Sequence, residues 1–307
     1  MRKTISFYKY TTIKNPQETR DQLFAMLNEL DCRGRIYVAH EGINAQMNVP
    51  AERWEAFETQ LRDITEFADV EFKHAVEESE SFKKLKIKVK DKIAADGLDD
   101  SSFDPANTGS YVTAKQMNEY IENPGAVVVD MRNRYESEIG HFESAHLPQV
   151  DSFREELAII TDELADKKDA PIALYCTGGI RCEKASAWMK HKGFSNVSHL
   201  KGGIINYAHA VQEQGIENKF KGKNFVFDER HGERVGDEII SVCHLCEKNK
   251  SDEHYNCAEF TCNALFIGCE NCIQDLKGFC SSPCQSGIPR DLNLGDSTFF
   301  RKRVLGR

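Results

Sequence analysis

Long apolar runs are missing from this sequence. In 307 residues, no apolar stretch approaches the roughly 20 residues that a transmembrane helix needs. Residues 1–10 include three basic side chains but neither an apolar core nor a small-residue cleavage site, so we expect no secretory signal. The sequence predicts a protein that does not cross a membrane and works in the cytoplasm.

An excess of positive charge is also missing. Lysine and arginine total 40 against 49 acidic residues, which gives a net charge of −9. This balance excludes a globally basic, histone-like nucleic-acid binder but leaves room for a local basic groove. A hydrophobic fraction of 40% suits a globular protein, and the length allows about two or three domains.

Fingerprints of common redox cofactors are absent as well. No glycine motif for a flavin or a nicotinamide is found, and no His-x-Asp or His-x-Glu iron triad stands out. We therefore expect no flavin or nicotinamide site in this protein.

Cysteine, by contrast, is abundant. The chain has eleven cysteines, and eight of them fall between Cys243 and Cys284. In the reducing compartment that we expect, clustered cysteines are more often metal ligands or catalytic residues than disulfides.

The most specific motif is the loop Tyr-Cys-Thr-Gly-Gly-Ile-Arg-Cys at residues 175–182. It follows an apolar run at 172–175 and precedes a helix-like stretch at 183–192. Glycines let consecutive backbone N–H groups turn inward, and the helix N-terminus adds positive charge on the same side. The loop should therefore stabilise a thiolate, a persulfide or another small anion on Cys176. Between this cysteine and Arg181 lie Thr177, Gly178, Gly179 and Ile180.

The chemistry of Cys176 depends on its pKa. A free thiol has a pKa of about 8.5, so only a few per cent is thiolate at neutral pH. Lowering the pKa by about two units needs roughly 2.7 kcal/mol, which N–H dipoles and the Arg181 cation could supply. The alternative is a buried structural cysteine in a turn, but such a residue does not need the surrounding glycines and arginine.

Cys182 directly follows Arg181, in the first turn of the expected helix. A helix N-terminus lowers the pKa of a thiol. One hypothesis is that Cys182 resolves an oxidised or persulfidated Cys176 by forming a disulfide. In the alternative, its side chain faces away from Cys176.

Residues 1–95 predict an α+β domain of the ferredoxin-like type. Its order of elements is βαββαβ, which is typical of that fold. The expected strands are 5–12, 35–39, 43–49, 70–73 and 85–89, and the expected helices are 16–30 and 50–64.

Lysines alternate with apolar residues at 83–90. A strand with this pattern buries one face and exposes a strongly positive one. It is either an edge strand that lysine protects from aggregation or a surface that follows the phosphates of an RNA.

Residues 96–120 predict a linker and a leading helix. The stretch 91–112 is rich in Asp, Gly, Ser, Asn and Pro, and Thr113 then caps a helix at 114–121. Residues 121–218 predict an α/β domain with a parallel sheet, because strands alternate with helices, and the cysteine loop falls at the carboxyl end of a strand. The expected strands are 126–130, 171–175 and 197–200, and the helices are 154–167, 183–192 and 204–214.

Residues 125–210 resemble a rhodanese domain. The resemblance rests on Asp130-Met-Arg132, on Cys176-x-x-Gly-x-Arg181 and on neighbouring motifs that include Glu136, Gly140-His-Phe and Leu200-x-Gly-Gly. It implies that Cys176 accepts sulfur, that Arg181 closes the loop, and that Asp130 and Arg132 lie near its base. For these last two residues the alternative is a strand-end cap and a structural ion pair.

The arrangement over residues 1–284 is similar to the bacterial rhodanese-like tRNA uridine hydroxylases. The Gly-Lys-Asn-Phe-Val-Phe-Asp-Glu-Arg run from residue 222 adds to this resemblance. It implies a hydroxylase that places 5-hydroxyuridine at the wobble position of tRNA, using molecular oxygen and an electron donor. The alternative is a sulfurtransferase that carries a persulfide on Cys176 and passes its sulfur to a tRNA base or a small molecule.

Residues 219–285 predict a cysteine-rich module with two four-cysteine metal sites. Zinc is the expected metal, and an iron–sulfur cluster is the alternative. The segment has too few large apolar residues to fold easily without a metal. The first pair of cysteines could join the third and the second the fourth, or neighbouring pairs could join. The candidate ligands are Cys243, Cys246, Cys257, Cys262, Cys269, Cys272, Cys280 and Cys284.

Positive charge gathers in two further stretches. Residues 286–307 predict a basic, disordered tail that touches RNA. A second group lies just before the cysteine cluster, and with the lysine strand it could form a groove leading to Cys176. This group consists of Lys219, Lys221, Lys223, Arg230 and Arg234.

Overall fold

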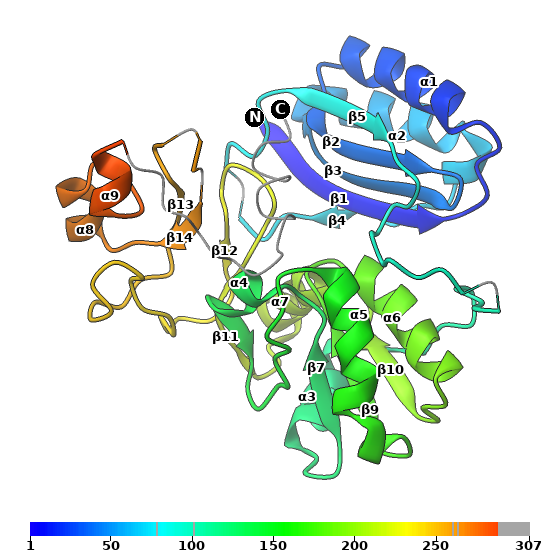
Figure 1. Cartoon of the computed structure of the whole chain (residues 1–307). Helices are drawn as coiled ribbons and strands as arrows, with labels where there is room; N and C mark the ends of the chain where they lie inside the picture. The colour runs from blue at the N-terminus through cyan, green and yellow to red at the C-terminus, as the bar shows by residue number, and fades with distance from the viewer. Residues whose placement is uncertain (78, 101, 260, 263, 288–307) are drawn as a thin grey trace.

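The computed structural model describes residues 1–287 except 78, 101, 260 and 263. Three parts follow one another along the chain: an N-terminal α+β domain, a central α/β domain and a C-terminal module (Figure 1). The expected fold class is thereby confirmed. None of the helices described is long and apolar enough to span a membrane. The basic tail predicted from residue 286 lies almost wholly outside the described residues.

The N-terminal domain is a five-stranded sheet in the order β4-β1-β3-β2-β5. The first four strands are antiparallel neighbours in the ferredoxin-like order, and β5 adds to the edge parallel to β2. Its elements are β1 (Arg2–Tyr10), α1 (Pro16–Glu29), β2 (Arg33–Ala39), β3 (Gly42–Pro50), a 3-10 turn (Ala51–Arg53), α2 (Trp54–Arg62), a 3-10 turn (Thr65–Phe67), β4 (Lys73–His74) and β5 (Leu85–Val89).

Both helices cover one face of this sheet. Alternate residues such as Phe7 and Ile36 are fully buried against Leu23 of α1 and Leu61 of α2. The period of two in each strand places the intervening side chains on the opposite face, which points toward the rest of the molecule (Figure 1).

The helix expected from residue 50 begins later. Pro50 is the last residue of β3, where it lies opposite Arg2 of β1, and the Ala51 N–H donates to the Met1 carbonyl. This pairing holds Pro50 extended, so α2 starts at Trp54. The strand expected at 70–73 is also shorter, since only Lys73–His74 pairs with β1.

The central domain has a four-stranded parallel sheet in the order β6-β10-β9-β7. Helices α5 and α6 pack on one face, and α3 and α7 pack on the other. Its elements are β6 (Ser110–Val112), α3 (Ala114–Glu122), β7 (Val127–Asp130), α4 (Arg134–Ser137), β8 (Gly140–Phe142), α5 (Phe153–Glu163), a 3-10 turn (Ala165–Lys167), β9 (Ile172–Tyr175), α6 (Ile180–His191), β10 (Val197–Leu200) and α7 (Gly203–Gln214).

The end of the expected linker belongs to this sheet. Ser110–Val112 pairs with β10, and Tyr111 lies against His199 with their ring centres 4.5 Å apart. The composition of this stretch hid the strand because its pairing partner lies almost 90 residues later in the chain.

The C-terminal module attaches to the central domain through strand pairing. β11 pairs with β8 in antiparallel orientation, and Phe225 packs with Ile139 and Ile267. The elements of the module are β11 (Phe220–Asn224), β12 (Glu233–Arg234), β13 (His254–Asn256), β14 (Leu265–Ile267), α8 (Glu270–Asp275) and α9 (Ser282–Gln285).

A buried lysine joins the N-terminal domain to the central domain. Lys184 of α6 is 2% exposed, and its Nζ atom lies 2.8 Å from Glu41 and 2.6 Å from Asp96. Because a buried charge is tolerated only when it is paired, these two carboxylates fix the N-terminal domain above α6.

Candidate active site

Cys176 lies directly after the fully buried strand β9 and is itself 0% exposed. The Gly179 N–H donates to its sulfur over 3.1 Å. Gly179 has a φ of +98°, a conformation that favours glycine, and it caps the N-terminus of α6. The glycine thus turns an amide and a helix terminus toward the sulfur.

The first turn of α7 holds the same loop from the other side. The Ile204 N–H donates to the Cys176 carbonyl over 3.0 Å, and the Ile205 N–H donates to the Thr177 carbonyl over 3.2 Å. Gly203 has a φ of +66°, and a Cβ there would lie 2.4 Å from the Cys176 carbonyl oxygen. Both loop carbonyls are therefore fixed by backbone amides.

The pKa of Cys176 is lowered to about 6. Burial by itself would raise it, but hydrogen bonds from the Cys182 side chain, the Arg181 charge and the N–H groups of Cys182 and Gly179 outweigh burial. The thiolate is the main form at neutral pH. This is the form that acts as a nucleophile.

Cys182 points to Cys176 rather than away from it. Its thiol and its backbone N–H both hydrogen-bond to the Cys176 sulfur, and its side chain is fully buried. Burial and the neighbouring sulfur raise the pKa of Cys182 well above its usual range. Of the two cysteines, Cys176 therefore carries the charge and Cys182 keeps its proton.

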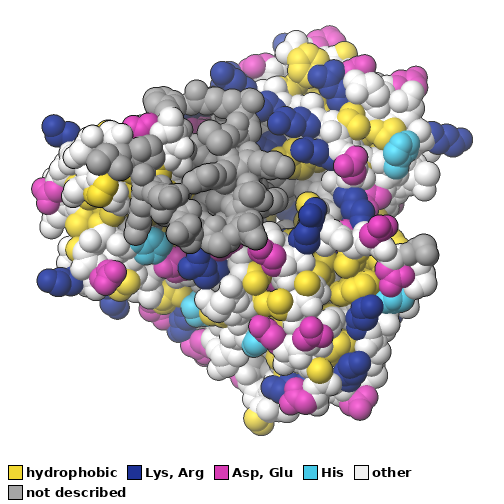
Figure 2. Space-filling model, viewed as in Figure 1, with side chains coloured by type: hydrophobic (Ala, Val, Ile, Leu, Met, Phe, Trp, Pro, Cys, Tyr) yellow, Lys and Arg dark blue, Asp and Glu magenta, His cyan; other side chains and the backbone are white. Residues whose placement is uncertain are grey.

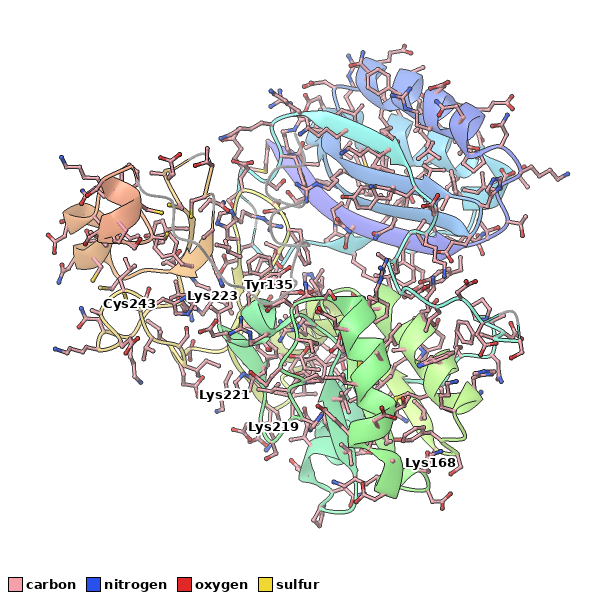
Figure 3. All side chains as sticks on the ribbon, in the orientation of Figure 1. Tyr135, Lys168, Lys219, Lys221, Lys223 and Cys243 are labelled. Carbon is pink, nitrogen blue, oxygen red and sulfur yellow. The ribbon has the colours of Figure 1, made fainter. Side chains whose placement is uncertain are left out.

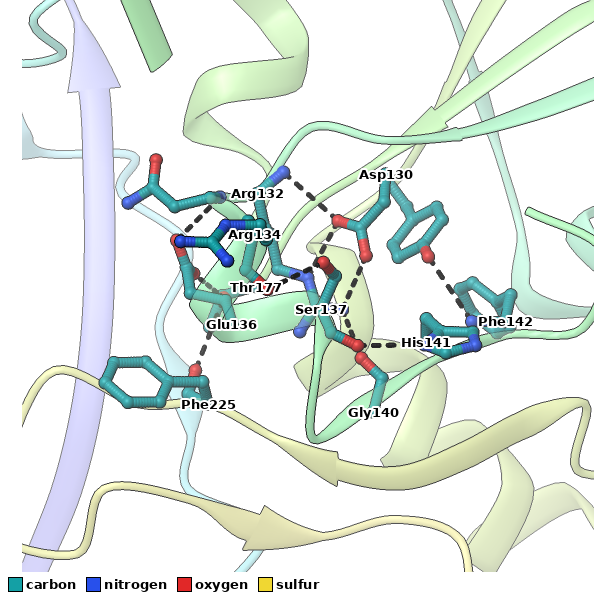
Figure 4. Close-up of polar contacts among 12 residues, drawn as sticks. Asp130, Arg132, Arg134, Glu136, Ser137, Gly140, His141, Phe142, Thr177 and Phe225 are labelled. Atoms are coloured by element: carbon teal, nitrogen blue, oxygen red, sulfur yellow. Dashed lines mark hydrogen bonds and ion pairs between the residues drawn. The ribbon is translucent and has the colours of Figure 1, made fainter. Parts of the chain in front are cut away.

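Arg181 is held by a carboxylate. Its Nη1 and Nη2 atoms donate to Glu136 over 2.7 and 2.8 Å, and the Glu136 side chain is 0% exposed. Burial would lower the pKa of Arg181, but Glu136 raises it well above its usual range. Glu136 also accepts from Asn133 at the start of α4 and from Thr177 Oγ1 (Figure 4). It thus connects the loop to α4.

Asp130 and Arg132 form a fully buried ion pair. Two side-chain hydrogen bonds of 2.8 and 2.6 Å join them, and the Arg132 side chain also donates to the Gly140 carbonyl over 2.6 Å (Figure 4). Asp130 lies in register with Tyr175, the residue before Cys176. The pair lies one strand from the loop and fixes the end of β7 against β8.

The N-terminal domain supplies side chains that the sequence did not single out. Tyr8 of β1 donates to Glu183 of α6 over 2.9 Å, and its hydroxyl lies beside Gly179. Tyr10 donates to the Ile180 carbonyl over 3.3 Å. The sequence pattern could have revealed them. Phe7 belongs to the core, so Tyr8 and Tyr10 fall on the opposite, polar face of the strand.

A second carboxyl group lies behind the loop. Glu156 of α5 is fully buried, and neither of its side-chain oxygens has a hydrogen-bond partner among the residues that the structure describes. Burial raises the pKa of Glu156 well above the usual range, which favours its protonated form. Its position in the apolar stripe formed by Phe153, Leu157 and Ile160 could have revealed it.

The eight C-terminal cysteines form two groups. Within each group, the sulfur atoms all lie within 4.8 Å of one another, and each group could hold a metal ion. The first pair thus joins the third and the second joins the fourth, which decides between the two pairings that the sequence left open. One group is Cys243, Cys246, Cys269 and Cys272, and the other is Cys257, Cys262, Cys280 and Cys284.

The geometry of these groups suits a tetrahedral metal. The Cys280 sulfur lies 3.7 Å from that of Cys262 and 3.6 Å from that of Cys284. A tetrahedron with zinc–sulfur bonds of about 2.3 Å has edges of about 3.8 Å. Amide donors also reach the sulfurs, as the Cys257 sulfur accepts from the Cys280 N–H and the Cys269 sulfur from Asn249. Such donors stabilise thiolate ligands.

The five cations at residues 219–234 that we expected to help form a basic groove each lie within ion-pair distance of at least one carboxylate. Figure 3 shows Lys219, Lys221 and Lys223 on the side of the central domain that faces the cysteine-rich module. The pairs are Lys219–Glu217, Lys221–Glu238, Lys223–Asp252, Arg230–Asp228 and Arg234–Asp252.

The lysine strand β5 differs in this respect. Lys84, Lys86, Lys88 and Lys90 are exposed. Across residues 1–287 as described, none of them forms an ion pair, although Lys83 pairs with Glu229. Figure 2 shows lysine and arginine side chains gathered over this part of the N-terminal domain.

Family models match each part of the chain. Residues 2–93 match the UPF0176 acylphosphatase like domain, residues 113–210 the rhodanese-like domain, and residues 221–285 the rhodanase C-terminal model. With the Cys176 loop and Arg181 in place, the protein is a member of the rhodanese superfamily.

Whole-chain relatives narrow this class. A protein of Leptospira interrogans is 52% identical, covering 98% of this chain and 84% of its own length. A protein of Salmonella typhi is 51% identical, covering 92% of this chain and 81% of its own. Both are named tRNA uridine(34) hydroxylase, and this chain belongs to the tRNA uridine(34) hydroxylase family.

Proposed function

We propose that this protein hydroxylates uridine 34 of tRNA to 5-hydroxyuridine, with Cys176 at the reacting centre. The observation that carries the proposal is the Cys176 thiolate, held by the Gly179 amide and by Cys182. This chain is similar over 98% of its own length to a protein named tRNA uridine(34) hydroxylase. With tRNA as the substrate, the compartment that we expect is the cytoplasm.

The oxygen atom would come from molecular oxygen. When one atom enters the C5–H bond of uracil, the other is reduced to water by two electrons and two protons, so an electron donor takes part. The Cys176 thiolate would add to C6 of the ring and activate C5, or an oxidised or persulfidated sulfur would carry the oxidant.

A substrate can approach the loop at Gly178. Thr177 and Gly178 are partly exposed, although Cys176 is not. A Cβ at Gly178 would meet no atom within 4 Å. Open space therefore borders the loop next to the sulfur, and we infer that the base enters there.

The two cysteine groups would hold zinc as a structural metal. Zinc there would fix the fold of the module, because two segments that are separated along the chain supply the ligands of each site. The module places Phe225 and Phe227 beside the loop: the Phe225 carbonyl accepts from Thr177, and the Phe227 ring lies 6.0 Å from the Arg181 guanidinium carbon.

Nucleoside analysis of tRNA tests the function. A deletion strain should lack 5-hydroxyuridine at position 34, the wild-type gene should restore it, and Cys176→Ala should not. Full rescue by Cys176→Ala would show that Cys176 takes no part in the chemistry. Loss of a thiolated base in place of hydroxyuridine would identify a sulfurtransferase that carries a persulfide on Cys176.

A further inference from the structure

One face of the N-terminal sheet is polar and is not covered by α1 and α2. Ile36 and Ala45 point into the core beneath the helices, whereas their neighbours Arg35 and Gln46 lie on the other face and are half-buried. The same alternation continues on β1 and β5. The helices leave this face uncovered. It contacts the rest of the chain at Arg35, which donates to the Phe227 carbonyl over 3.4 Å, and at Asn44, which donates to the Ile93 carbonyl over 3.2 Å.

Two rows of side chains cross this face, because residues in register on neighbouring strands project to the same side. We refer to these two rows as the polar sheet face. The first row consists of Lys86, Arg35, Gln46 and Ser6. The second row consists of Lys88, Tyr37, Asn44 and Tyr8.

The second row connects the outer edge of the sheet to the cysteine loop. It ends at Tyr8, which donates to Glu183 and whose hydroxyl would lie 2.9 Å from a Cβ at Gly179. Its other end is the exposed Lys88. β5 and β1 are three strand spacings apart, about 14 Å, which a few nucleotides can span.

The outer end of the polar sheet face is positively charged. Lys86 and Lys88 form no ion pair within the described part of the chain, and the ammonium of Lys90 lies 5.9 Å from the centre of the Tyr37 ring. This surface contrasts with the neutralised cations at 219–234. Within the described residues, lysines without an ion pair thus lie on the edge from which the polar sheet face leads to Cys176.

We propose that the polar sheet face binds the single-stranded anticodon loop of tRNA. Lys86 and Lys88 contact backbone phosphates, and Tyr37 stacks on a base next to uridine 34. Single-stranded RNA fits because its unstacked bases can lie on an aromatic ring, whereas paired bases cannot. This inference rests on the proposed function, since it takes tRNA as the substrate.

Binding of the full-length protein to an anticodon stem-loop RNA at several salt concentrations tests the phosphate contacts. The variant Lys86→Ala/Lys88→Ala should bind more weakly, and the slope of log affinity against log salt should be shallower by about 1.4. The matched control is Lys115→Ala/Lys167→Ala, which removes two exposed lysines from the central domain. Equal affinities and slopes for the two double variants would overturn the proposal.

Tyr37 tests the stacking contact. Tyr37→Ala should weaken binding of the stem-loop about tenfold, and Tyr37→Phe should bind as the wild type does, because the ring is what stacks. A fully paired hairpin should bind the three proteins equally. If Tyr37→Ala weakens binding of both RNAs alike, or of neither, then no loop base stacks on Tyr37.

The two proposals can fail separately. The wild-type protein could bind the stem-loop but form no 5-hydroxyuridine, while these variants bind the stem-loop more weakly. In that case the proposed function is wrong and the polar sheet face still binds RNA. If hydroxylation proceeds and the variants bind and react like the wild type, the face serves another partner, such as an acidic protein, and this inference is wrong.

Discussion

The thiol of Cys182 hydrogen-bonds to the sulfur of Cys176, and both side chains are fully buried. This contact stabilises a negative charge on Cys176 and works against one on Cys182. The two neighbouring thiols therefore have different roles: one is a thiolate at neutral pH and the other is a proton donor.

The pH dependence of the enzyme should follow from this contact. Because the pKa of Cys176 is about 6, its thiolate is present above that pH and is lost as the pH falls through it. The absorbance difference at 240 nm between wild type and Cys176→Ala should show a midpoint near pH 6, and hydroxylation should decline below it. Cys182→Ala should raise the midpoint, and Cys182→Ser should keep it closer to the wild-type value. A wild-type midpoint above pH 8 would contradict the thiolate assignment.

Mild oxidation should link the same pair. The Cys176 thiolate, once oxidised to the sulfenic acid, has the Cys182 thiol in hydrogen-bonding contact, so the two should condense to a disulfide with release of water. Peptide mapping by mass spectrometry should find the Cys176–Cys182 linkage, and Cys182→Ser should stop at the sulfenic acid. Oxidation of wild type without this linkage would argue against a resolving role for Cys182.

Glu136 should be essential for the folded loop. Glu136→Ala leaves the Arg181 guanidinium half-buried without its carboxylate, which costs about 3–5 kcal/mol in the free energy of unfolding. Urea denaturation measures this loss. Arg134→Ala is the control in the same helix, since its ion pair with Asp151 is partly exposed and should matter by about 1 kcal/mol or less. Equal losses of unfolding free energy in the two variants would show that the Arg181–Glu136 pair stabilises the protein no more than an exposed ion pair does.

Metal content should reveal the cysteine pairing. Wild-type protein purified without chelators should carry about two zinc ions per chain if each group binds one metal. Cys246→Ala with Cys272→Ala should remove one ion because both belong to one group, whereas Cys246→Ala with Cys262→Ala should remove two. Inductively coupled plasma analysis of the three proteins measures this. Iron with sulfide instead of zinc would identify clusters, and loss of one ion in both double variants would contradict the grouping.

Lys184 should couple the N-terminal domain to the active site. Lys184→Met removes the only cation that joins Glu41 to Asp96 within the described residues, while Asp96 keeps its ion pair with Lys92. We expect hydroxylation to fall severalfold and the segment at 97–108 to be cleaved faster in limited proteolysis. Lys201→Met is the control, because its bridge to Glu71 is exposed and worth little. Similar proteolysis of both variants would show that Lys184 does not hold the domains together.

Much of the fold could be predicted because its signals are local. The aromatic and β-branched residues of β1 and the apolar run Ile172–Tyr175 of β9 are both typical of strands. Glycine is expected where the backbone turns sharply, so the loop that holds Cys176 could be predicted before the residues packed around it were known. The positions of Asp130 and Arg132 near the loop were expected from the resemblance to a rhodanese domain.

Other features depend on chain segments that meet only in the folded protein. Spacing does not distinguish the two pairings of the C-terminal cysteines, and only the packing of the module brings Cys243 to Cys269. Composition marked Lys221 and Arg234 as basic, but the carboxylates that neutralise them lie elsewhere in the chain.

The amino-acid sequence by itself determined the three-part fold and the reactive loop, because both arise from short-range periodicity and from glycine. Only the tertiary structure decided what surrounds Cys176. Glu136 forms an ion pair with Arg181, and Tyr8 lies beside the loop. The polar sheet face extends from the lysines of β5 to this loop. These contacts join residues 45 to 175 positions apart, and no local pattern encodes such a distance.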